Sequence, residues 1–381
     1  MSNTPKLSIG FSNGNLLKYI PSIDGIGTMI GTGITNGNLN KVFSINSLAD
    51  AELQGITIGA EPVAHRHLSE FYTDLGGKQQ LYLLLLPAAV TMAQMLDIND
   101  ETHANLLLKA SNGLEGYIAV FRSPAGGYAP GADFMDADVA AAVAAAKTFV
   151  AGQNAKLKFF RVLIEGRVND ETQPVIYAPN AAANGFAGVV LGGTLNDHSA
   201  SVGLALARKL KYACHIKLGK VANGPLSAPQ IYIGSKTLDQ VANLDTLHGL
   251  GYISFVTYPG KAGFFFGIDN MASNDDYKIL AHGATVDAAA KVARAVYIDD
   301  LEGEVDTNPN GTITEESAKH LEDTIEQQVK VSLGDRISGF RALVDRTSNI
   351  INTSTTNISL SVLPKGYNTW INVTIGLTAI L

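Results

Sequence analysis

Few side-chain combinations in this sequence of 381 residues could bind or transform a small molecule. The glycine-rich stretch at residues 25–33 has the composition of a loop that holds the phosphates of a dinucleotide. Its third glycine falls one place late, however, and Gly37 with Asn38 prevents a helix from following. We interpret these glycines as part of a strand that packs closely on its neighbours, with a nucleotide site as the minor alternative.

Residues 306–313 match the first eight positions of the loop in a calcium-binding helix–loop–helix, with Gly311 at the sixth. The twelfth position should carry a bidentate glutamate but is Ser317, and Asp306 is the only carboxylate in register. A turn at Asn310 and Gly311 between two helices explains the same residues. We therefore favour the turn over a calcium site.

Two groupings that contain histidine match metal or catalytic sites only in composition. His65 and His67 lie two places apart on a predicted helix, where they do not share a face. Residues 196–199 place the residue types of a nucleophilic triad side by side, whereas real triads are assembled from distant segments. We interpret this stretch as the N-cap of the following helix, with Asp197 or Ser199 as the capping residue.

The single cysteine, Cys214, lies next to His215 in a run of residues that is typical of a strand. A core cysteine is favoured over a nucleophile. One cysteine excludes an intramolecular disulfide and suits a reducing compartment. The sequence therefore predicts no catalytic residues, no cofactor and no metal, and a protein that is not an enzyme.

Composition narrows the class of partner. Charged residues make up 17% of the chain and apolar residues 46%, with 38 glycines and a net charge of −7. A negative chain is a poor ligand for nucleic-acid phosphates, and so little charge favours a surface that other proteins cover. The longest apolar run, at residues 81–90, contains Pro87 and is too short to span a bilayer. The first residues lack the features of a signal peptide, so we expect a soluble protein made in the cytoplasm, without nucleic-acid or membrane partners.

Alternating helices and strands are predicted from residue 22 to residue 270 and indicate an α/β core, which has room for an inserted outer subdomain. Its strand segments are apolar without period-two alternation, which indicates a sheet covered on both faces. The expected strands are residues 81–86, 116–121, 158–164, 185–191, 230–233 and 252–257. The expected helices are residues 47–55, 62–76, a helix up to about 110, one from 133 or 136 to 150, 199–210 and 238–247.

The pattern then changes to a compact α+β C-terminal domain, predicted at residues 271–366. A helix is expected at residues 281–301, followed by a turn-rich loop. Thr312 and Glu315 have the spacing of a capping box, which predicts a second helix up to Leu333. Strands are expected at residues 339–344 and 358–362.

Both ends of the chain carry alternating apolar and polar residues, the pattern of a strand with one buried face. The apolar residues are Leu7, Ile9 and Phe11 in the N-terminal arm, residues 1–21, and Ile371, Val373, Ile375 and Leu377 in the C-terminal arm, residues 367–381. Burying the apolar side of the last strand contributes on the order of 5–10 kcal/mol, whereas ordering its backbone costs roughly 10–20 kcal/mol. That strand must pair with a sheet, and its spacing alone leaves open whether the sheet belongs to the same chain or to a neighbour.

Taken together, the order of these elements resembles the sheath proteins of contractile phage tails and of related contractile injection machines. The resemblance covers most of the chain and is strongest from about residue 281 to the end. The stretches that carry it are residues 25–33, 43–45, 47–51, 67–72 and 81–86, the helices at 288–301 and up to 333, and the closing residues 337–345, 349, 358–364 and 371–377.

The resemblance implies a mechanical function. Sheath subunits stack as a helical sleeve around a rigid inner tube, are assembled in an extended, metastable state, and contract to drive the tube through a target envelope. The implied partners are further copies of the chain, the inner tail tube protein, and baseplate and tail-terminator proteins. The implied location is a phage virion or a phage-tail-like particle assembled in the bacterial cytoplasm.

The resemblance also implies a role for the arms and for one helix. The arm residues named above are expected to add strands to the C-terminal sheets of neighbouring subunits. The charged face of the helix at residues 314–333 is expected to lie towards the tube, because the C-terminal domain of the family is the inner one.

Two other classes of function remain open from the sequence. A nucleotide-dependent α/β enzyme would need a phosphate loop, for which residues 25–33 are the only candidate. Another tail component, such as a terminator or a baseplate ring protein, shares parts of the layout but would form closed rings instead of long helical assemblies.

Overall fold

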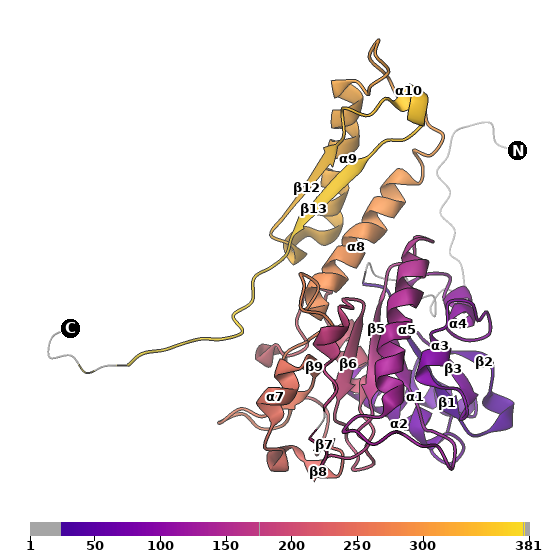
Figure 1. Cartoon of the computed structure of the whole chain (residues 1–381), viewed down its shortest axis with the longest axis vertical. Coiled ribbons are helices and arrows are strands. Elements are labelled where there is room, and N and C mark those ends of the chain that lie inside the picture. Colours follow the sequence, from indigo (N-terminus) through magenta and orange to yellow (C-terminus); the bar gives the residue numbers. More distant parts are fainter. Residues whose placement is uncertain (1–23, 175, 376, 378–381) are drawn as a thin grey trace, which may run out of the picture.

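The computed structural model describes residues 24–174, 176–375 and 377, and its core is built around one seven-stranded sheet (Figure 1). The strand order is β2-β3-β1-β4-β5-β6-β9, and every neighbouring pair is parallel except β2 with β3. These strands are β1 (Ile26–Gly33), β2 (Lys41–Ile45), β3 (Leu81–Pro87), β4 (Glu115–Phe121), β5 (Arg161–Gly166), β6 (Ala187–Leu191) and β9 (Tyr252–Ile253).

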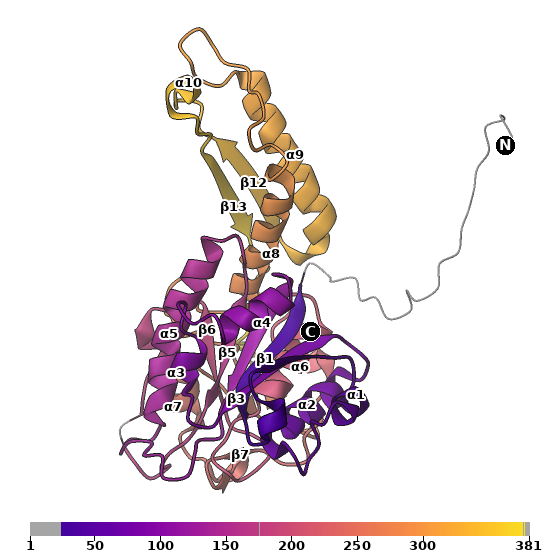
Figure 2. The ribbon, with the colours of Figure 1, turned by 90° about the vertical axis from the view of Figure 1, so that its right-hand side faces the viewer.

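Helices cover both faces of this sheet (Figure 2). α2 and α6 pack together on one face, and α3 and α5 pack together on the other. The helices of the core are α1 (Leu48–Leu53), α2 (Pro62–Leu75), α3 (Met92–Met95), α4 (Ala104–Ala110), α5 (Ala137–Asn154), α6 (Val202–Lys211) and α7 (Leu244–Gly249). Strands β4, β5 and β6 are buried along their whole lengths. The prediction of an α/β core with a sheet covered on both faces is confirmed.

The glycine-rich stretch is strand β1, which lies between β3 and β4 and is buried at every residue. A Cβ added to Gly31 would lie 2.3 Å from atoms of the Phe121 ring, and one added to Gly27 would lie 2.6 Å from Leu210 Cδ1. Glycine is therefore required here for close packing of a strand on its neighbours. The strand interpretation is confirmed, and the alternative of a phosphate-binding loop is wrong.

Residues 280–363 form a C-terminal unit that extends away from the core sheet (Figure 1). Its elements are α8 (Leu280–Tyr297), α9 (Glu315–Leu333), β12 (Gly339–Val344), α10 (Ile350–Thr353) and β13 (Ile358–Leu363). α8 contacts both core strand β5 and α9, while β12 and β13 form an antiparallel hairpin with α9 packed against β12. Within the described residues, no helix is long and apolar enough to cross a membrane.

Helix α9 begins later than its predicted capping box. Its N-cap is Thr314, whose side chain accepts a hydrogen bond from the amide of Ser317 at 3.3 Å. Thr312 cannot serve as the cap because it belongs to the preceding turn, where its hydroxyl donates to Asn310 Oδ1 at 2.8 Å. The pairing of Thr312 with Glu315 is therefore wrong, although the predicted helix exists.

Two expected core elements are divided by turns. The helix expected to end at residue 110 is two short helices, α3 and α4. Asp97 accepts a hydrogen bond from the amide of Asn99 at 2.9 Å, and Asp100 from the amide of Thr102 at 2.7 Å, and these turns separate the two. The helix expected at residues 238–247 is a short 3-10 helix (Leu238–Gln240) followed by α7.

Two expected strands also lie partly outside the main sheet. Residues 230–233 contribute only β7 (Tyr232–Ile233), which pairs with β8 (Lys236–Thr237) around Gly234 at φ +62°. Residues 252–257 divide into β9, which joins the main sheet, and β10 (Phe255–Val256), which pairs with β11 (Phe265–Phe266).

Candidate assembly surface

The two histidines on α2 connect elements of the core and do not form a pair. His65 Nε2 lies 2.8 Å from Glu52 Oε1 on α1, whereas His67 is fully buried and lies 3.6 Å from Glu70. Side chains two residues apart on a helix do not face each other, so the two rings do not converge on one ion. The part of the chain that the structure describes contains no group of three or more His, Cys, Asp or Glu residues that could hold a metal.

Residues 196–199 form a local turn. Asp197 Oδ1 accepts hydrogen bonds from the amide of Ser199, at 3.1 Å, and from its hydroxyl. Helix α6 begins only at Val202, with Ser201 as its N-cap. The predicted cap at Asp197 or Ser199 is wrong, because these two side chains satisfy each other before the helix begins.

Cys214 is buried, as predicted for a core cysteine, but it lies in a turn and not in the expected strand. Its amide donates a hydrogen bond to Asp24 Oδ1 at 2.9 Å. Burial raises the pKa of the Cys214 thiol. A raised pKa leaves little thiolate, so the geometry does not favour a nucleophile here.

Sequence patterns did not indicate Glu165, a buried glutamate near the carboxyl end of β5. Open α/β sheets often bind ligands outside the carboxyl ends of their strands. Glu165 is fully buried, and its carboxylate accepts hydrogen bonds from the amides of Arg122 at 2.8 Å and Ala200 at 3.2 Å. Protein amides thus satisfy the carboxylate, which ties β5 to the segments after β4 and before α6.

Glu70 on α2 has a related role. It accepts hydrogen bonds from the hydroxyls of Thr194 at 2.6 Å and Ser201 at 2.8 Å. Burial by itself would raise the pKa of Glu70, but the neighbouring His67 and Arg66 lower this pKa below its usual value. The charged carboxylate therefore holds α2 to the start of α6, and no pattern in the sequence indicated this contact.

The candidate assembly surface is the β12–β13 hairpin and the segment that follows it. The pairs on the face towards α9 are Phe340 with Val362, Ala342 with Leu360, and Val344 with Ile358. α9 packs against β12, so Ala342 is only 3% exposed, whereas its partner Leu360 on β13 is 36% exposed. The helix layer therefore covers β12 more completely than β13.

The outer edge of β12 is occupied by side chains of α9. In this register the amides of Ala342 and Val344 point away from β13. Ala342 N donates to Glu326 Oε1 at 2.9 Å, and Val344 N donates to Glu322 Oε1 at 2.8 Å. Two backbone donors that could bind another strand are thus already bonded within the unit.

Arg346 completes this edge. Its guanidinium bonds Glu322 through two contacts of 2.7 and 3.2 Å and donates to the carbonyl of Val344 at 3.0 Å. The hydrogen bonds from Arg346 are the main cause that lowers the pKa of Glu322 to about 2. Glu322 is therefore charged at neutral pH, the form that accepts the Val344 amide most strongly.

The outer edge of β13 is different. The amides of Ile358, Leu360 and Val362 point away from β12 in the same register. Among the described residues, no side chain or loop bonds the backbone of these three positions. Within the part of the chain that the structure describes, this edge is therefore unpaired, which is the template that an added strand requires.

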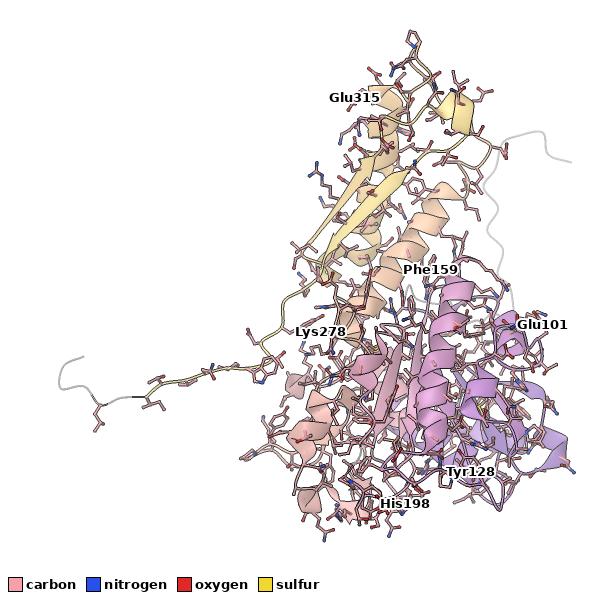
Figure 3. All side chains as sticks on the ribbon, viewed as in Figure 1. Glu101, Tyr128, Phe159, His198, Lys278 and Glu315 are labelled. Atoms are coloured by element: carbon pink, nitrogen blue, oxygen red, sulfur yellow. The ribbon has the colours of Figure 1, made fainter. Side chains whose placement is uncertain are left out.

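Residues 370–375 of the predicted C-terminal arm extend away from the hairpin and the core into open space (Figure 3). Residues 371–375 and 377 form no strand in the single chain. The four apolar residues of the arm, each at least 74% exposed, are Ile371, Val373, Ile375 and Leu377. The corresponding N-terminal residues Leu7, Ile9 and Phe11 lie outside the described residues. Burial of either set in a neighbouring subunit stays a prediction.

The root of the arm is fixed to the core by Tyr367. Its hydroxyl donates to the carbonyl of His215 at 2.6 Å, and its ring stacks on that of His282 with centroids 5.4 Å apart. Lys217 Nζ lies 5.3 Å from the centre of the same ring and donates to Thr369 Oγ1 at 3.3 Å. The chain is thereby drawn from β13 to the core before the alternating residues begin.

The C-terminal unit is joined to the core by a buried ion pair. Arg161 of β5 bonds Asp287 of α8 through two contacts of 2.6 and 2.7 Å. The same guanidinium donates to the carbonyls of Gly185 at 2.7 Å and Gly283 at 3.1 Å. This network fixes the first half of α8 to the amino end of β5.

Comparison with known proteins gives one family and one fold. A family model described as DUF2586, N-terminal domain, matches residues 4–270. No curated protein matches the sequence.

Three solved structures illustrate the fold that this chain shares. A chain of the anti-feeding prophage baseplate is 12% identical with a TM-score of 0.62, covering 99% of this chain and 100% of that one. The anti-feeding prophage helical sheath in its contracted state is 13% identical with a TM-score of 0.59, and the match covers both chains completely. A sheath tail protein from Desulfitobacterium hafniense is 11% identical with a TM-score of 0.53, covering 94% of this chain and 100% of that one. The resemblance to sheath proteins is thus confirmed at the level of the fold.

Proposed function

We propose, on the premise that this chain belongs to the DUF2586 family and has the fold of contractile sheath proteins, that it is a structural subunit of a contractile sheath. In this function, copies polymerise as a helical sleeve around an inner tube and contract to drive the tube through a target envelope. The observation that carries the proposal is the exposed, strand-patterned arm beside a hairpin with one open edge. Within the described residues, neither the alternating segment of the arm nor the open edge is paired in a single subunit, whereas strand exchange between subunits requires both.

The arms supply links that survive a change of shape. A strand added to a neighbour is held by backbone hydrogen bonds, which depend little on the identity of the side chains. Because one subunit's arm enters the next subunit's sheet, the contact is heterologous, and it gives a helical array where the rotation between neighbours does not close. We extend the proposal to Leu7, Ile9 and Phe11 at the other end of the chain.

The remaining partners are assigned by position. The inner tail tube protein would face the exposed charged side of α9, which includes Glu316, Lys319 and Lys330. Baseplate and tail-terminator proteins would bind the two ends of the sleeve. The assembly belongs to a phage tail or a phage-tail-like particle and would form in the bacterial cytoplasm, without nucleic acid, membrane, cofactor or enzymatic activity.

A second candidate is a ring-forming component of the same machine. It is favoured by one observation, the match to a chain from a baseplate structure. Both candidates use the same fold, and they differ in whether the repeated contact closes.

Negative-stain electron microscopy of the concentrated full-length protein tests the proposal, with a chain truncated after Gly366 as its control. We expect hollow cylinders of uniform width from the full-length chain and separate particles from the truncated chain. Closed rings from the full-length chain would favour the second candidate. Ordered sleeves from the truncated chain would contradict the role of the C-terminal arm.

A further inference from the structure

We infer that one turn of the core, residues 213–217, is a shared anchor that couples the roots of the two arms, and that the buried Lys209 positions this turn. We call residues 213–217 the anchor turn. The inference goes beyond the proposed function, because it concerns contacts within a single subunit and does not depend on which sheet receives an arm.

The root of the C-terminal arm contacts the anchor turn at two places. The Tyr367 hydroxyl donates to the carbonyl of His215 at 2.6 Å, and Lys217 Nζ donates to Thr369 Oγ1 at 3.3 Å. Lys217 also lies 3.6 Å from Asp269 Oδ1, a carboxylate that is fully buried in the core. The first residues of this arm are therefore tied to both the backbone and a side chain of the anchor turn.

The root of the other arm contacts the same turn. Asp24, the first described residue after the predicted N-terminal arm, accepts a hydrogen bond from the amide of Cys214 at 2.9 Å. Nη1 of Arg336, which follows α9, lies 2.8 and 2.9 Å from the two carboxylate oxygens of Asp24. Asp24 is therefore held between the anchor turn and the C-terminal unit.

The path between the two contacts is short. Only the backbone of Cys214 and His215 separates the amide that bonds Asp24 from the carbonyl that bonds Tyr367. Peptide units are planar, and a hydrogen bond of 2.8 Å from the amide of Ile216 to the carbonyl of residue 213 closes the turn. A displacement at one contact therefore reaches the other with few rotations to absorb it.

Lys209 of α6 fixes the anchor turn from inside the core. It is 1% exposed, and its ammonium group donates to the carbonyls of Cys214 at 2.6 Å and Ile216 at 2.9 Å. These two carbonyls lie on either side of His215, the residue that binds Tyr367. Burial of an ammonium group is unfavourable unless its donors are satisfied, and a role in positioning the anchor turn explains why a lysine occupies this place.

Changes at one root, measured at the other root, test the coupling in dilute full-length protein. Tyr367→Ala is measured by hydrogen exchange of the Cys214 amide relative to core amides. Asp24→Ala is measured by the fluorescence anisotropy of Trp370, the single tryptophan. Circular dichroism establishes that both variants are folded.

We expect Tyr367→Ala to accelerate exchange of the Cys214 amide by about two- to tenfold, the factor that one hydrogen bond contributes. We expect Asp24→Ala to lower the anisotropy of Trp370, because coupling between two sites is reciprocal. Unchanged exchange in the first variant together with unchanged anisotropy in the second would show that the roots are independent, and would overturn the inference.

The role of Lys209 is tested with both measurements on Lys209→Met, which removes the charge and keeps an unbranched side chain. Both roots should loosen, and Lys209→Arg, which keeps a cation, should restore part of the effect. The matched control is Lys211→Met on the same helix, because the Lys211 side chain donates to the carbonyl of Asp74 at 2.5 Å and not to the anchor turn. Equal results for Lys209→Met and Lys211→Met would overturn the role of Lys209.

Two features keep these outcomes distinct. The root variants leave Lys209 in place, so they decide the coupling even where Lys209→Met does not fold. Coupling in a chain that forms no sleeves would support this inference and contradict the proposed function. Sleeves formed by a chain without coupling would contradict this inference alone.

Discussion

The core sheet and the β12–β13 hairpin are both built from apolar strands, but only the core sheet is complete. Strands β4, β5 and β6 have a neighbour on each side and helices on both faces, so they are buried throughout. The hairpin has one helix-covered face and one exposed face, and no residue of β13 is fully buried. In the proposed function, a strand of a second molecule would complete the hairpin in the way that the chain itself completes the core.

This difference separates two tasks in one chain. The core supplies a rigid body whose polar contacts, such as those of Glu165, are satisfied internally. The C-terminal unit leaves backbone groups of β13 unpaired and apolar side chains of the following segment exposed in the single chain, and in the proposed function these contact neighbours. Changes in the core should therefore affect folding, and changes at β13 or the arm should affect assembly alone.

The largest effect on assembly is expected from Leu360→Pro. Proline removes the outward amide of β13, and its fixed φ is tolerated on an edge strand, so the hairpin itself keeps its hydrogen bonds to β12. We expect a folded chain that forms no sleeves, measured by circular dichroism and negative-stain microscopy. Leu360→Ala, which keeps the amide, is the matched control and should still assemble. Sleeves formed by Leu360→Pro would show that assembly does not need the open edge of β13, and would contradict the distinction drawn between the two sheets.

The largest effect on folding is expected from Asp287→Ala at the junction. This change leaves the Arg161 guanidinium buried without its carboxylate, which costs about 3–5 kcal/mol in the free energy of unfolding. This loss in the free energy of unfolding is measured by denaturant titration, with circular dichroism as the signal. Asp287→Asn keeps the shape and one acceptor and should cost less. A loss below about 1 kcal/mol, the range of an exposed pair, would contradict the assignment of this junction as a buried link.

A pH dependence is expected at the β12 edge. The pKa of Glu322 is about 2 in the folded chain against 4.5 ordinarily. Because the folded pKa is the lower one, the stabilisation is complete above about pH 4.5 and is lost as the pH falls towards about 2. Hydrogen exchange of the Val344 amide, corrected for the intrinsic rate, should therefore accelerate relative to core amides over that window.

The control for this pH effect is Glu322→Gln, which cannot titrate. In that variant the exchange of Val344 relative to the core should no longer change between about pH 4.5 and about 2. An equal pH response in both chains would show that another group controls the β12 edge.

The smallest effect is expected from Tyr367→Phe at the root of the arm. The change removes one hydrogen bond to His215 and keeps the stacked ring, so the anchor should weaken by roughly 0.5–1.5 kcal/mol. Trp370 is the only tryptophan of the chain. Its fluorescence anisotropy in dilute protein should fall slightly with Tyr367→Phe and further with Tyr367→Ala. Unchanged anisotropy in both variants would show that Tyr367 does not anchor the arm.

Local patterns in the sequence were sufficient for most of the core. The apolar run of β3 and the glycines of β1 predicted buried strands because burial on both faces leaves a continuous apolar pattern. Boundaries were less accurate where short polar side chains compete for the backbone. Asp97 and Asp100 divide one expected helix into two, and Thr312 is held in a turn and does not cap α9.

The candidate site was predictable only in part. The alternation of Ile371, Val373 and Ile375 indicated a strand that needs a partner, and the structure leaves these side chains exposed in the single chain. The closed edge of β12 could not be predicted, because Glu322 is indistinguishable by pattern from the exposed glutamates of the same helix. The contacts that anchor Tyr367 could not be predicted either, because its partner His215 is far away in the sequence.

The central claim, that the arm of one copy completes the hairpin of another, is tested most directly by mixing two defective subunits. The chain truncated after Gly366 keeps β13 and lacks the arm, while Leu360→Pro keeps the arm and lacks a usable edge. Sedimentation velocity and native mass spectrometry of the mixture should show a one-to-one complex that neither chain forms alone and that does not grow further. If the mixture stays monomeric while the unaltered chain forms sleeves, the arm does not act through β13 and the account is wrong.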